Sequence, residues 1–389
     1  MVAVDDDPAK LNQTIHGVPV KGTLEDIPEL CNRYGIHSII IAIPTLKGSK
    51  LNHVIDLCVS THCAVQLLSD PQLVGSGAPQ QGAFRELNPA DFLSRDEVTL
   101  DTDQISGYLT GKTVLVTGGG GSIGSELCRQ VMRFKPGKLL IFDIYENCAY
   151  ELLMELQQKY GRDIPVTVLI GSIRDKKRLD EVFETYHPTV VFHAAAHKHV
   201  PLMEVSPAEA VKNNVLGTKN LLVSASEHDV ERFVQLSTDK AVNPTSVMGC
   251  TKRICEMLIQ TFAGNTDMKC VAVRFGNVLG SHGSVIPLFE AQIKKGGPVT
   301  LTDPNIERYF MTIPEAAQLV LQAGALAESG NIYVLDMGEP VKIMDLAKQL
   351  IRFYGYEPGV NMEIKIVGLR PGEKLYEELM MDEEQDKMR

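Results

Sequence analysis

A glycine-rich turn between an apolar strand and a helix limits the fold of this chain more than any other feature. Residues 114–127 read VLVTGGGGSIGSEL, with Gly118, Gly121 and Gly124 at intervals of three. Gly118 would allow the tight turn, Gly121 would let backbone N–H groups approach a phosphate, and Gly124 would let helix and strand pack closely. The order of strand, glycines and helix predicts the first βα unit of a doubly wound sheet.

Six apolar runs extend this pattern along the chain. Helical stretches separate most of them, so the alternation predicts an α/β fold with a doubly wound, Rossmann-like parallel sheet. The strands are expected within residues 112–119, 138–144, 166–172, 190–196, 232–239 and 269–278.

The chain has 389 residues, which is enough for two domains. Residues 1–71 contain a helix ending at Gly35, then a strand, a helix and a strand, which predicts a partial α/β domain whose first strand and helix are missing. Residues 72–110 combine Gly, Pro and Gln with scattered charges and are expected to be a linker. Residues 111–389 would form the main domain, with a smaller ligand-binding part mainly in 278–389.

Composition and charge argue against several classes of function. The net charge of −11 and the absence of Trp disfavour a nucleic-acid-binding surface. The eight Cys residues form no CxxC pair and no Cys/His cluster, so no metal site is predicted, and reduced thiols in a cytoplasmic chain are expected. No apolar run reaches the roughly 18 residues of a membrane span, so this chain is not expected to cross a membrane.

An acid at the end of the second predicted strand points to a dinucleotide cofactor. Asp143 is placed to accept a hydrogen bond from a ribose hydroxyl, and its charge would repel the 2′-phosphate of NADP, so NAD is predicted. Ser172 or Ile173, after the third strand, could border the adenine. The small residues Ala194 and Ala195, after the fourth strand, would let the backbone lie along the cofactor.

Asn214 in KNNVLGT is expected to order a helix or a water beside the site, with purely local hydrogen bonding as the alternative. The predicted cofactor-binding residues are Gly118, Gly121, Ser122, Ile123, Gly124, Asp143, Ser172, Ile173, Ala194, Ala195, Asn214 and Lys252.

Residues 237–253, STDKAVNPTSVMGCTKR, carry the predicted chemistry. They follow the fifth strand, and ligands of parallel sheets lie beyond the carboxyl ends of the strands. A desolvated Lys240 near another cation would become a base near neutral pH, and a partly buried Asp239 could stay protonated as an acid. The alternative is a surface turn with solvated charges. The predicted catalytic residues are Thr238, Asp239, Lys240, Met248 and Lys252.

One of these residues departs from a common pattern. Simple dehydrogenases and epimerases of this fold use a Tyr followed four residues later by a Lys that lowers the Tyr pKa. Lys252 is present, but Met248 stands where the Tyr would be. Because Met has no proton to exchange, another group must take the alcohol proton.

From residue 112 to residue 389 the chain resembles the bacterial UDP-N-acetylglucosamine 4,6-dehydratases, which are extended short-chain dehydrogenase/reductases of glycan biosynthesis. The motifs that carry the resemblance are VLVTGGGGSIGSEL, FHAAAHKHVPLME, LSTDKAVNPTSVMGCTKR, VRFGNVLGSHGSVIPLF and RPGEKLYEEL. The resemblance implies bound NAD, UDP-N-acetylglucosamine as substrate and a homodimer or higher homo-oligomer. Ser172 departs from it, since relatives usually carry Asp there, which could weaken adenosine binding.

The large, membrane-anchored members of this family, which retain the configuration at C5, carry Met at the position of Met248. Residues 1–70 resemble the second part of the domain that precedes the catalytic domain in those members. The resemblance therefore implies that the chain is a soluble part of a longer protein, anchored in the inner membrane with its catalytic domain in the cytoplasm.

The resemblance also implies a mechanism. Hydride leaves sugar C4, a base removes the C5 proton, water leaves from C6 with help from an acid, and hydride returns to C6. Thr238 would bind the C4 oxygen, Asp239 would be the acid and Lys240 the base, while Lys252 would orient the nicotinamide ribose. The acceptor of the C4 hydroxyl proton stays open between Asp239 and a water held by Thr238 and Lys252.

A UDP-sugar also needs cations for its diphosphate. Arg308 and Arg370 can pair with phosphate oxygens, and Glu373 could accept a hydrogen bond from a ribose hydroxyl. Each arginine could instead be a surface charge, and His199 could be structural. The predicted substrate-binding residues are Lys198, His199, Asn277, Ser284, Val285, Arg308, Arg370 and Glu373.

Other functions remain open at this point. A C5-inverting dehydratase would keep the Tyr, and a UDP-sugar 4-epimerase would not need the Asp239–Lys240 pair. A non-catalytic NAD-binding scaffold is disfavoured because the triplet from Thr238 to Lys240 is intact.

Overall fold

The computed structural model describes residues 1–43, 46, 48–68, 84–87, 91, 100–281 and 283–385. The chain divides into two compact units. The first unit comprises Met1–Glu97, Val285–Pro304 and Lys342–Val367, and the second comprises Val98–Ser284, Asn305–Val341 and Gly368–Arg389.

A seven-stranded parallel sheet forms the centre of the second unit, with the order β17-β12-β11-β10-β7-β8-β9. Its strands are β7 (Thr113–Thr117), β8 (Lys138–Asp143), β9 (Val166–Ile170), β10 (Val190–His193), β11 (Arg232–Leu236), β12 (Lys269–Arg274) and β17 (Ile332–Val334). The predicted fold class is confirmed, and six of the strands lie where the apolar runs predicted them. Strand β17 was not predicted because its three residues are too few to show a pattern.

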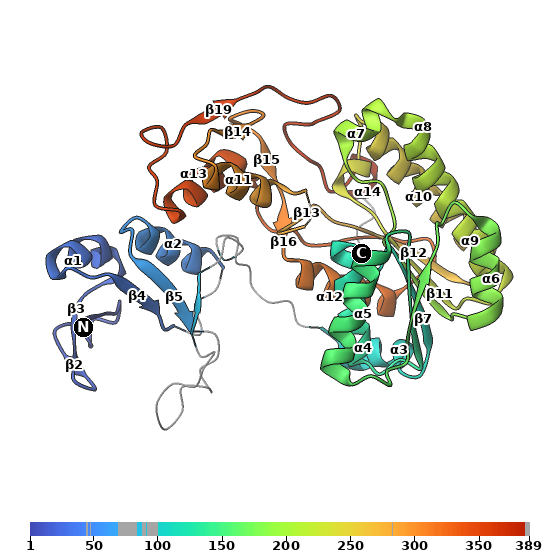
Figure 1. The fold of residues 1–389 in the computed structure, drawn as a ribbon, viewed down its shortest axis with the longest axis horizontal. Coiled ribbons are helices and arrows are strands. Elements are labelled where there is room, and N and C mark those ends of the chain that lie inside the picture. The colour runs from blue at the N-terminus through green and yellow to red at the C-terminus, as the bar shows by residue number, and fades with distance from the viewer. Residues whose placement is uncertain are drawn as a thin grey trace. The chain divides into compact units, whose positions relative to one another are not determined.

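Helices cover both faces of this sheet (Figure 1). One apolar core joins the sheet to α3 (Thr102–Leu109), α4 (Ser122–Arg133), α5 (Glu146–Tyr160) and α12 (Ile313–Leu326). A second core joins the other face to α6 (Lys176–Tyr186), α9 (Gly217–Glu227) and α10 (Val247–Ala263). Strands buried on both faces explain why their sequences are almost continuously apolar.

The strand order reverses between β7 and β10, which pair with each other at the middle of the sheet. Chain connections run away from this point in opposite directions, so the carboxyl ends of β7, β10 and β11 border a crevice where ligands of such sheets bind. The glycine turn follows β7, and the Thr238–Lys240 triplet follows β11.

The first unit contains a short parallel pair, β4 (Ser38–Ile41) and β5 (Ala64–Leu68), connected by α2 (Gly48–Val59), as the sequence predicts. Strand β6 (Phe84–Glu86) pairs with β5 in antiparallel fashion. Before these lie a small sheet of β1 (Ala3–Val4), β2 (Thr14–Ile15) and β3 (Val18–Gly22) and the helix α1 (Ile27–Tyr34). The sequence did not predict the small sheet.

The two units differ from the predicted domains. Helix α11 (Val285–Lys294), strand β14 (Val299–Leu301), helix α13 (Ile343–Phe353) and strand β19 (Ile364–Ile366) belong to the first unit. Gln349 on α13 donates a hydrogen bond to Asp56 on α2 at 2.9 Å, a contact between segments too far apart in sequence to predict. Within the predicted linker, α3 packs its buried Ile105 and Leu109 into the core of the second unit, while most of the linker lies outside the described residues.

The remaining described elements are short. They are a 3₁₀ turn (Leu24–Asp26), α7 (Val200–Val205), α8 (Pro207–Ala210), a π-helical stretch (Val211–Leu216), a second 3₁₀ turn (Asp239–Ala241), β13 (Asn277–Val278), β15 (Glu307–Arg308), β16 (Phe310–Met311), β18 (Val341–Lys342) and α14 (Asp382–Gln385). Among the described residues, no helix is both long and apolar enough to span a membrane.

Candidate active site

The glycine turn after β7 has the shape of a phosphate-binding loop. Gly118 has a φ of +66°, and a Cβ there would lie 2.7 Å from the backbone nitrogen of Ala195. A side chain at Gly124 would collide with the carbonyl oxygen of Gly118. Gly121 precedes the first turn of α4, which begins at Ser122, so the free N–H groups of the helix face the turn. The residues present therefore fit a dinucleotide pyrophosphate.

Asp143 ends β8 beside this loop. Its carboxylate accepts hydrogen bonds from the backbone N–H groups of Gly120 at 2.8 Å and Tyr145 at 2.9 Å. The side chain therefore holds the loop in place, a role that the sequence did not predict. Its predicted contact with a ribose hydroxyl stays a prediction.

The other predicted cofactor residues are divided between the crevice and the core. Ala195 backs directly onto Gly118, and Ala194 and Ile123 pack against the core on the α4 side of the sheet. Ile173 is buried and touches the position of Gly217, and Ser172 accepts a hydrogen bond from the N–H of Arg174 at 3.2 Å.

Asn214 fastens the loop that follows β10. Its amide oxygen accepts from the N–H of His197 at 2.8 Å, and its amide nitrogen donates to the carbonyl of His197 and to the hydroxyl of Thr251, both at 3.0 Å. It lies in the π-helical stretch, a distortion often found at functional sites.

His193, which the sequence did not single out, joins three elements at the end of β10. Its two ring nitrogens are hydrogen-bonded to Thr117 on β7 at 2.7 Å and to Thr218 on α9 at 2.9 Å. Burial, with a smaller contribution from the charge of Lys252, lowers the pKa of His193 to about 3, so its imidazole is neutral near pH 7.

The predicted triplet forms a compact cluster. The Thr238 hydroxyl donates to Asp239 Oδ1 at 2.8 Å, and Lys240 Nζ donates to the same oxygen at 3.0 Å. Lys240 Nζ also donates to Asn277 Oδ1 at 3.3 Å and lies 3.5 Å from Glu377 Oε1. Asp239 is fully buried, and its Oδ2 has no hydrogen-bond partner among the described residues.

The pKa of Lys240 is shifted in the direction opposite to the one that the sequence predicts. Burial lowers its pKa, but the facing carboxylates of Asp239 and Glu377 outweigh this effect and raise the pKa above its ordinary value. The expectation of a lysine neutral near pH 7 assumed cationic neighbours, whereas two carboxylates lie closest to the amine. The free protein therefore holds Lys240 as an ammonium.

Met248 and Lys252 lie on α10, as predicted, but they do different things. Met248 is 3% exposed and belongs to a small apolar cluster with Met203 and Ala210. Lys252 Nζ donates to the carbonyl oxygen of Leu236, at the end of β11, at 2.6 Å. Burial lowers the pKa of Lys252.

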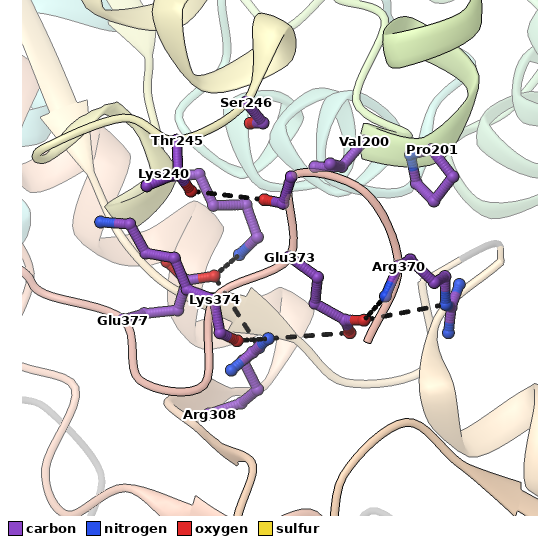
Figure 2. A pocket seen from close by; sticks show the side chains of 11 residues that line it. Val200, Pro201, Lys240, Thr245, Ser246, Arg308, Arg370, Glu373, Lys374 and Glu377 are labelled. Atoms are coloured by element: carbon purple, nitrogen blue, oxygen red, sulfur yellow. Dashed lines mark hydrogen bonds and ion pairs between the residues drawn. The ribbon is translucent and has the colours of Figure 1, made fainter. Parts of the chain in front are cut away.

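A pocket opens next to Lys240 (Figure 2). Arg308 lies at its floor, and its guanidinium donates to the carbonyls of Glu307 at 2.7 Å, Leu375 at 3.0 Å and Lys374 at 2.6 Å. The lining residues are Val200, Pro201, Lys240, Thr245, Ser246, Arg308, Arg370, Gly372, Glu373, Lys374 and Glu377.

The two predicted phosphate-binding arginines differ in their exposure and in the hydrogen bonds that they already make. The Arg308 guanidinium already donates hydrogen bonds to three backbone carbonyls. It would therefore contribute mainly its positive charge to phosphate binding. Arg370 is more exposed, at 53% of its side chain, and its Nε lies 3.9 Å from Glu373. Arg370 is therefore better placed to turn toward a phosphate.

Of the remaining predicted substrate residues, Lys198 and His199 are exposed after β10, and His199 fills the space where a side chain at Gly283 would lie. The Ser284 hydroxyl is buried without a hydrogen-bond partner among the described residues. Val285 begins α11 in the first unit, so the structure does not place it with the others.

A buried ion network, which the sequence did not predict, lies next to the Thr238–Asp239–Lys240 triplet. Glu256 accepts from the hydroxyl of Ser237 at 2.7 Å and from Arg274 at 2.8 and 3.0 Å. Arg274 is fully buried and also pairs with Glu384 of α14 at 2.7 Å. The network therefore connects Ser237, which directly precedes the triplet, to the C-terminal segment.

The family model for polysaccharide biosynthesis proteins matches residues 114–389. The chain is 53% identical to the capsular polysaccharide biosynthesis protein CapD of Staphylococcus aureus, over 98% of this chain and 64% of that protein, so it spans less than two thirds of this relative. It is 49% identical to an uncharacterized membrane protein of Methanocaldococcus jannaschii, over 72% of this chain and 84% of that protein. It is 34% identical to an inverting UDP-N-acetylglucosamine 4,6-dehydratase of Campylobacter jejuni, over 68% and 76%.

Among solved structures, Pen from Bacillus thuringiensis matches with a TM-score of 0.66 and 36% identity, over 71% of this chain and 86% of that one. More distant structures with the same fold include an epimerase and a dehydratase of nucleotide sugars that were solved with NAD. The match over residues 114–389 and the identities above show that the chain belongs to the polysaccharide biosynthesis protein family, whose fold is that of the nucleotide-sugar dehydratases and epimerases.

Proposed function

We propose that the protein catalyses the NAD-dependent 4,6-dehydration of UDP-N-acetylglucosamine to the 4-keto-6-deoxy sugar, with the configuration at C5 retained. The observation that carries the proposal is the Thr238–Asp239–Lys240 cluster, with Asp239 buried, after the carboxyl end of β11 in the same sheet whose β7 leads into the glycine turn. An acid and an amine within 3.0 Å of each other suit a reaction that removes one proton and delivers another. Oxidation alone would not require such a pair.

The cofactor site is proposed from the glycine turn, Asp143 and Lys252. NAD bound there would accept a hydride from sugar C4 and return it to C6. The N–H groups at the start of α4 would bind its pyrophosphate, and Asp143 a ribose hydroxyl. Lys252, fixed on the carbonyl of Leu236, would orient the nicotinamide ribose.

The hydrogen bond from Thr238 to Asp239 suggests a route for the C4 hydroxyl proton. The Thr238 hydroxyl would accept that proton while it passes its own to Asp239 Oδ1, 2.8 Å away. Asp239 would then hold the proton that the C6 hydroxyl needs in order to leave as water. This route balances the protons of the reaction without a tyrosine, because the C4 hydroxyl proton ends in the water that is released.

Lys240 would remove the C5 proton, exchange it with solvent and deliver a proton to the same face of the sugar, which retains the configuration. Arg308 and Arg370 would bind the diphosphate, with Glu373 at the nucleoside and Lys198, His199, Asn277 and Ser284 near the sugar and phosphates. Because Val285 begins α11 in the first unit, its predicted role depends on how the two units meet.

Two related reactions are the competing proposals: dehydration with inversion at C5 and 4-epimerisation. One relative is named an inverting dehydratase and another a UDP-glucose 4-epimerase. Met248 argues against both, because its side chain is buried in an apolar cluster and carries no exchangeable proton. We also propose that the whole protein is membrane-anchored and forms homo-oligomers, the former from its likeness to a membrane protein.

The test is incubation with UDP-N-acetylglucosamine in deuterated water, followed by NMR. The proposal expects a 4-keto-6-deoxy product that carries deuterium at C5 in the gluco configuration. Inverted C5, UDP-N-acetylgalactosamine as product, or no turnover with NAD present would each reject it. Asp239→Ala and Lys240→Ala should abolish elimination while the protein still retains NAD, and near-normal turnover in either variant would contradict the assigned roles.

A further inference from the structure

Glu377 approaches Lys240 from the C-terminal segment of the second unit, far along the chain from Asp239 (Figure 2). Its side chain is 3% exposed, and its Oε1 lies 3.5 Å from Lys240 Nζ and 3.8 Å from Arg308 Nε. Its Oε2 is buried and has no hydrogen-bond partner among the described residues. A carboxyl group this deep, with one oxygen near the Lys240 amine and the other without a hydrogen-bond partner among the described residues, requires an explanation.

Few groups near Lys240 and Glu377 can accept or release a proton. Arg308 stays protonated at any relevant pH, so it cannot exchange one. Lys374 donates to the carbonyl of Val242 at 2.9 Å and contacts Glu378, away from Lys240. The charged groups around Lys240 and Glu377 are Asp239, Arg308, Arg370, Glu373 and Lys374.

The proposed function gives Lys240 a task that its surroundings oppose. An amine must be neutral to remove the C5 proton, but the facing carboxylates hold Lys240 as an ammonium. Asp239 is already engaged, because it receives the C4 hydroxyl proton and passes it to the leaving water. Glu377 is then the carboxylate within reach that has no other task in the reaction.

We propose that Glu377 takes the ammonium proton of Lys240 when a UDP-sugar fills the pocket and gives it back after the product leaves; this inference rests on the proposed function. An N–H bond of the ammonium breaks, its electron pair stays on the nitrogen, and an O–H bond forms on Glu377 Oε1. The neutral amine then takes the C5 proton, and the resulting ammonium, whose protons exchange with solvent, later gives a proton to C5. In this role Glu377 acts on the reaction through Lys240 and is a positioning residue.

Two observations fit this exchange. Burial, together with the like charge of Asp239, raises the pKa of Glu377 despite the nearby cations, so the carboxyl can hold a proton. A bound diphosphate would bring negative charge to Arg308 and Arg370, which makes protonation of Glu377 easier still. The 3.5 Å separation suits a ligand-free site, since catalytic hydrogen bonds often tighten only when substrate binds.

The test compares Glu377→Gln with the wild-type protein across the pH range. The wild type should show a kcat that is nearly independent of pH around neutrality, because the proton stays within the pair. The variant must release the proton to solvent, so its kcat should fall about a hundredfold near neutral pH and recover about tenfold per pH unit as the solution becomes more alkaline. Glu377→Asp should restore part of the flat profile.

A second measurement separates this role from a structural one. In a single turnover, Glu377→Gln should accumulate reduced nicotinamide, since oxidation at C4 proceeds while removal of the C5 proton is slow. Substrate deuterated at C5 should then show a primary isotope effect larger than that of the wild type. The matched control is Glu378→Gln, an exposed neighbour whose carboxylate binds Asn243 and Lys374.

The outcomes distinguish the two proposals. A wild type that makes no 4-keto-6-deoxy product overturns the proposed function and this inference with it. A wild type that makes the product, with a Glu377→Gln variant that keeps the wild-type pH profile and isotope effect, overturns this inference alone. A variant that loses bound NAD or its cooperative unfolding transition points to a structural role and also overturns it.

Discussion

At the scale of single residues, Met248 occupies the position where simple dehydrogenases of this fold carry a tyrosine. Its side chain packs in an apolar cluster with Met203 and Ala210, while the proposed proton chemistry belongs to the hydrogen-bonded pair Asp239 and Lys240. The nearby Lys252 keeps its place on the carbonyl of Leu236. The position of the usual tyrosine has therefore become a packing position.

Met248→Leu should be nearly silent. The two side chains have similar volumes, so the change should cost less than about 1.5 kcal/mol in the free energy of unfolding and leave kcat within about threefold of the wild type. Met248→Ala should cost about 2–5 kcal/mol, because it opens a cavity in the cluster. Urea unfolding and steady-state kinetics check both. A large loss of kcat in a stable Met248→Leu variant would mean that the sulfur takes part in the reaction.

Thr238→Val tests the proposed proton route. Valine keeps the shape but removes the hydroxyl that donates to Asp239, so oxidation at C4 should slow by about a hundredfold. The appearance of reduced nicotinamide in a single turnover measures this step directly. Thr261→Val, on the exposed side of α10, serves as the control, and an equal effect in both variants would remove Thr238 from the mechanism.

At the scale of elements, the close contact between the glycine turn and the loop after β10 determines the shape of the proposed cofactor site. Gly118→Ala would force a φ of +66° on alanine and press its Cβ against the backbone of Ala195. We expect purified protein with much less NAD and a free energy of unfolding lowered by at least about 1–3 kcal/mol. Gly107→Ala on α3, where a Cβ has open space, should change neither the NAD content nor, by more than about 1 kcal/mol, the stability.

His193, which connects β7, β10 and α9, makes the stability of the protein depend on pH. Its folded-state pKa of about 3 lies below the usual value near 6.5, so the folded protein disfavours protonation. The stability that this provides is fully present above about pH 6.5 and is lost at about 1.4 kcal/mol per pH unit as the pH falls toward 3. Urea unfolding of His193→Gln should show a shallower slope in this window. Replacing the exposed His16 should leave the slope unchanged, and equal slopes for His193→Gln and the wild type would contradict the assignment.

At the scale of the whole molecule, the sequence predicts features that lie in one continuous run of residues. It does not predict contacts between segments that are far apart along the chain. The six long strands and the Thr238–Asp239–Lys240 triplet lie in continuous runs, and the parallel sheet brings their ends together. Glu377 could not be predicted, because its contact with Lys240 depends on where a segment without helix or strand returns to the sheet. The facing carboxylates of Asp239 and Glu377 together reversed the expected direction of the Lys240 pKa, since spacing along a chain does not reveal which charges face each other in space.

The C-terminal segment brings Arg370, Glu373 and Glu377 to the pocket, and the buried Arg274 holds the end of that segment. Arg274 binds Glu384 and the carbonyl of Leu379 on one side and Glu256 on the other. Breaking the pair with Glu384 should therefore loosen the pocket without touching the glycine turn. It also leaves part of a buried charge uncompensated, which is costly in a protein interior.

Glu384→Gln should lower the free energy of unfolding by about 1–3 kcal/mol at neutral pH and raise the KM for UDP-N-acetylglucosamine, with NAD content unchanged. Burial alone would raise the pKa of Glu384, but the hydrogen bonds from Arg274 outweigh it and lower the pKa. The stability from this carboxylate is therefore present above its unfolded pKa, near 4.3, and is lost as the pH falls through the lower folded value. Urea unfolding at neutral and acidic pH should show a smaller acid loss in Glu384→Gln than in the exposed control Glu383→Gln. If both variants lose stability in parallel and share the wild-type KM, the ion network does not hold the pocket.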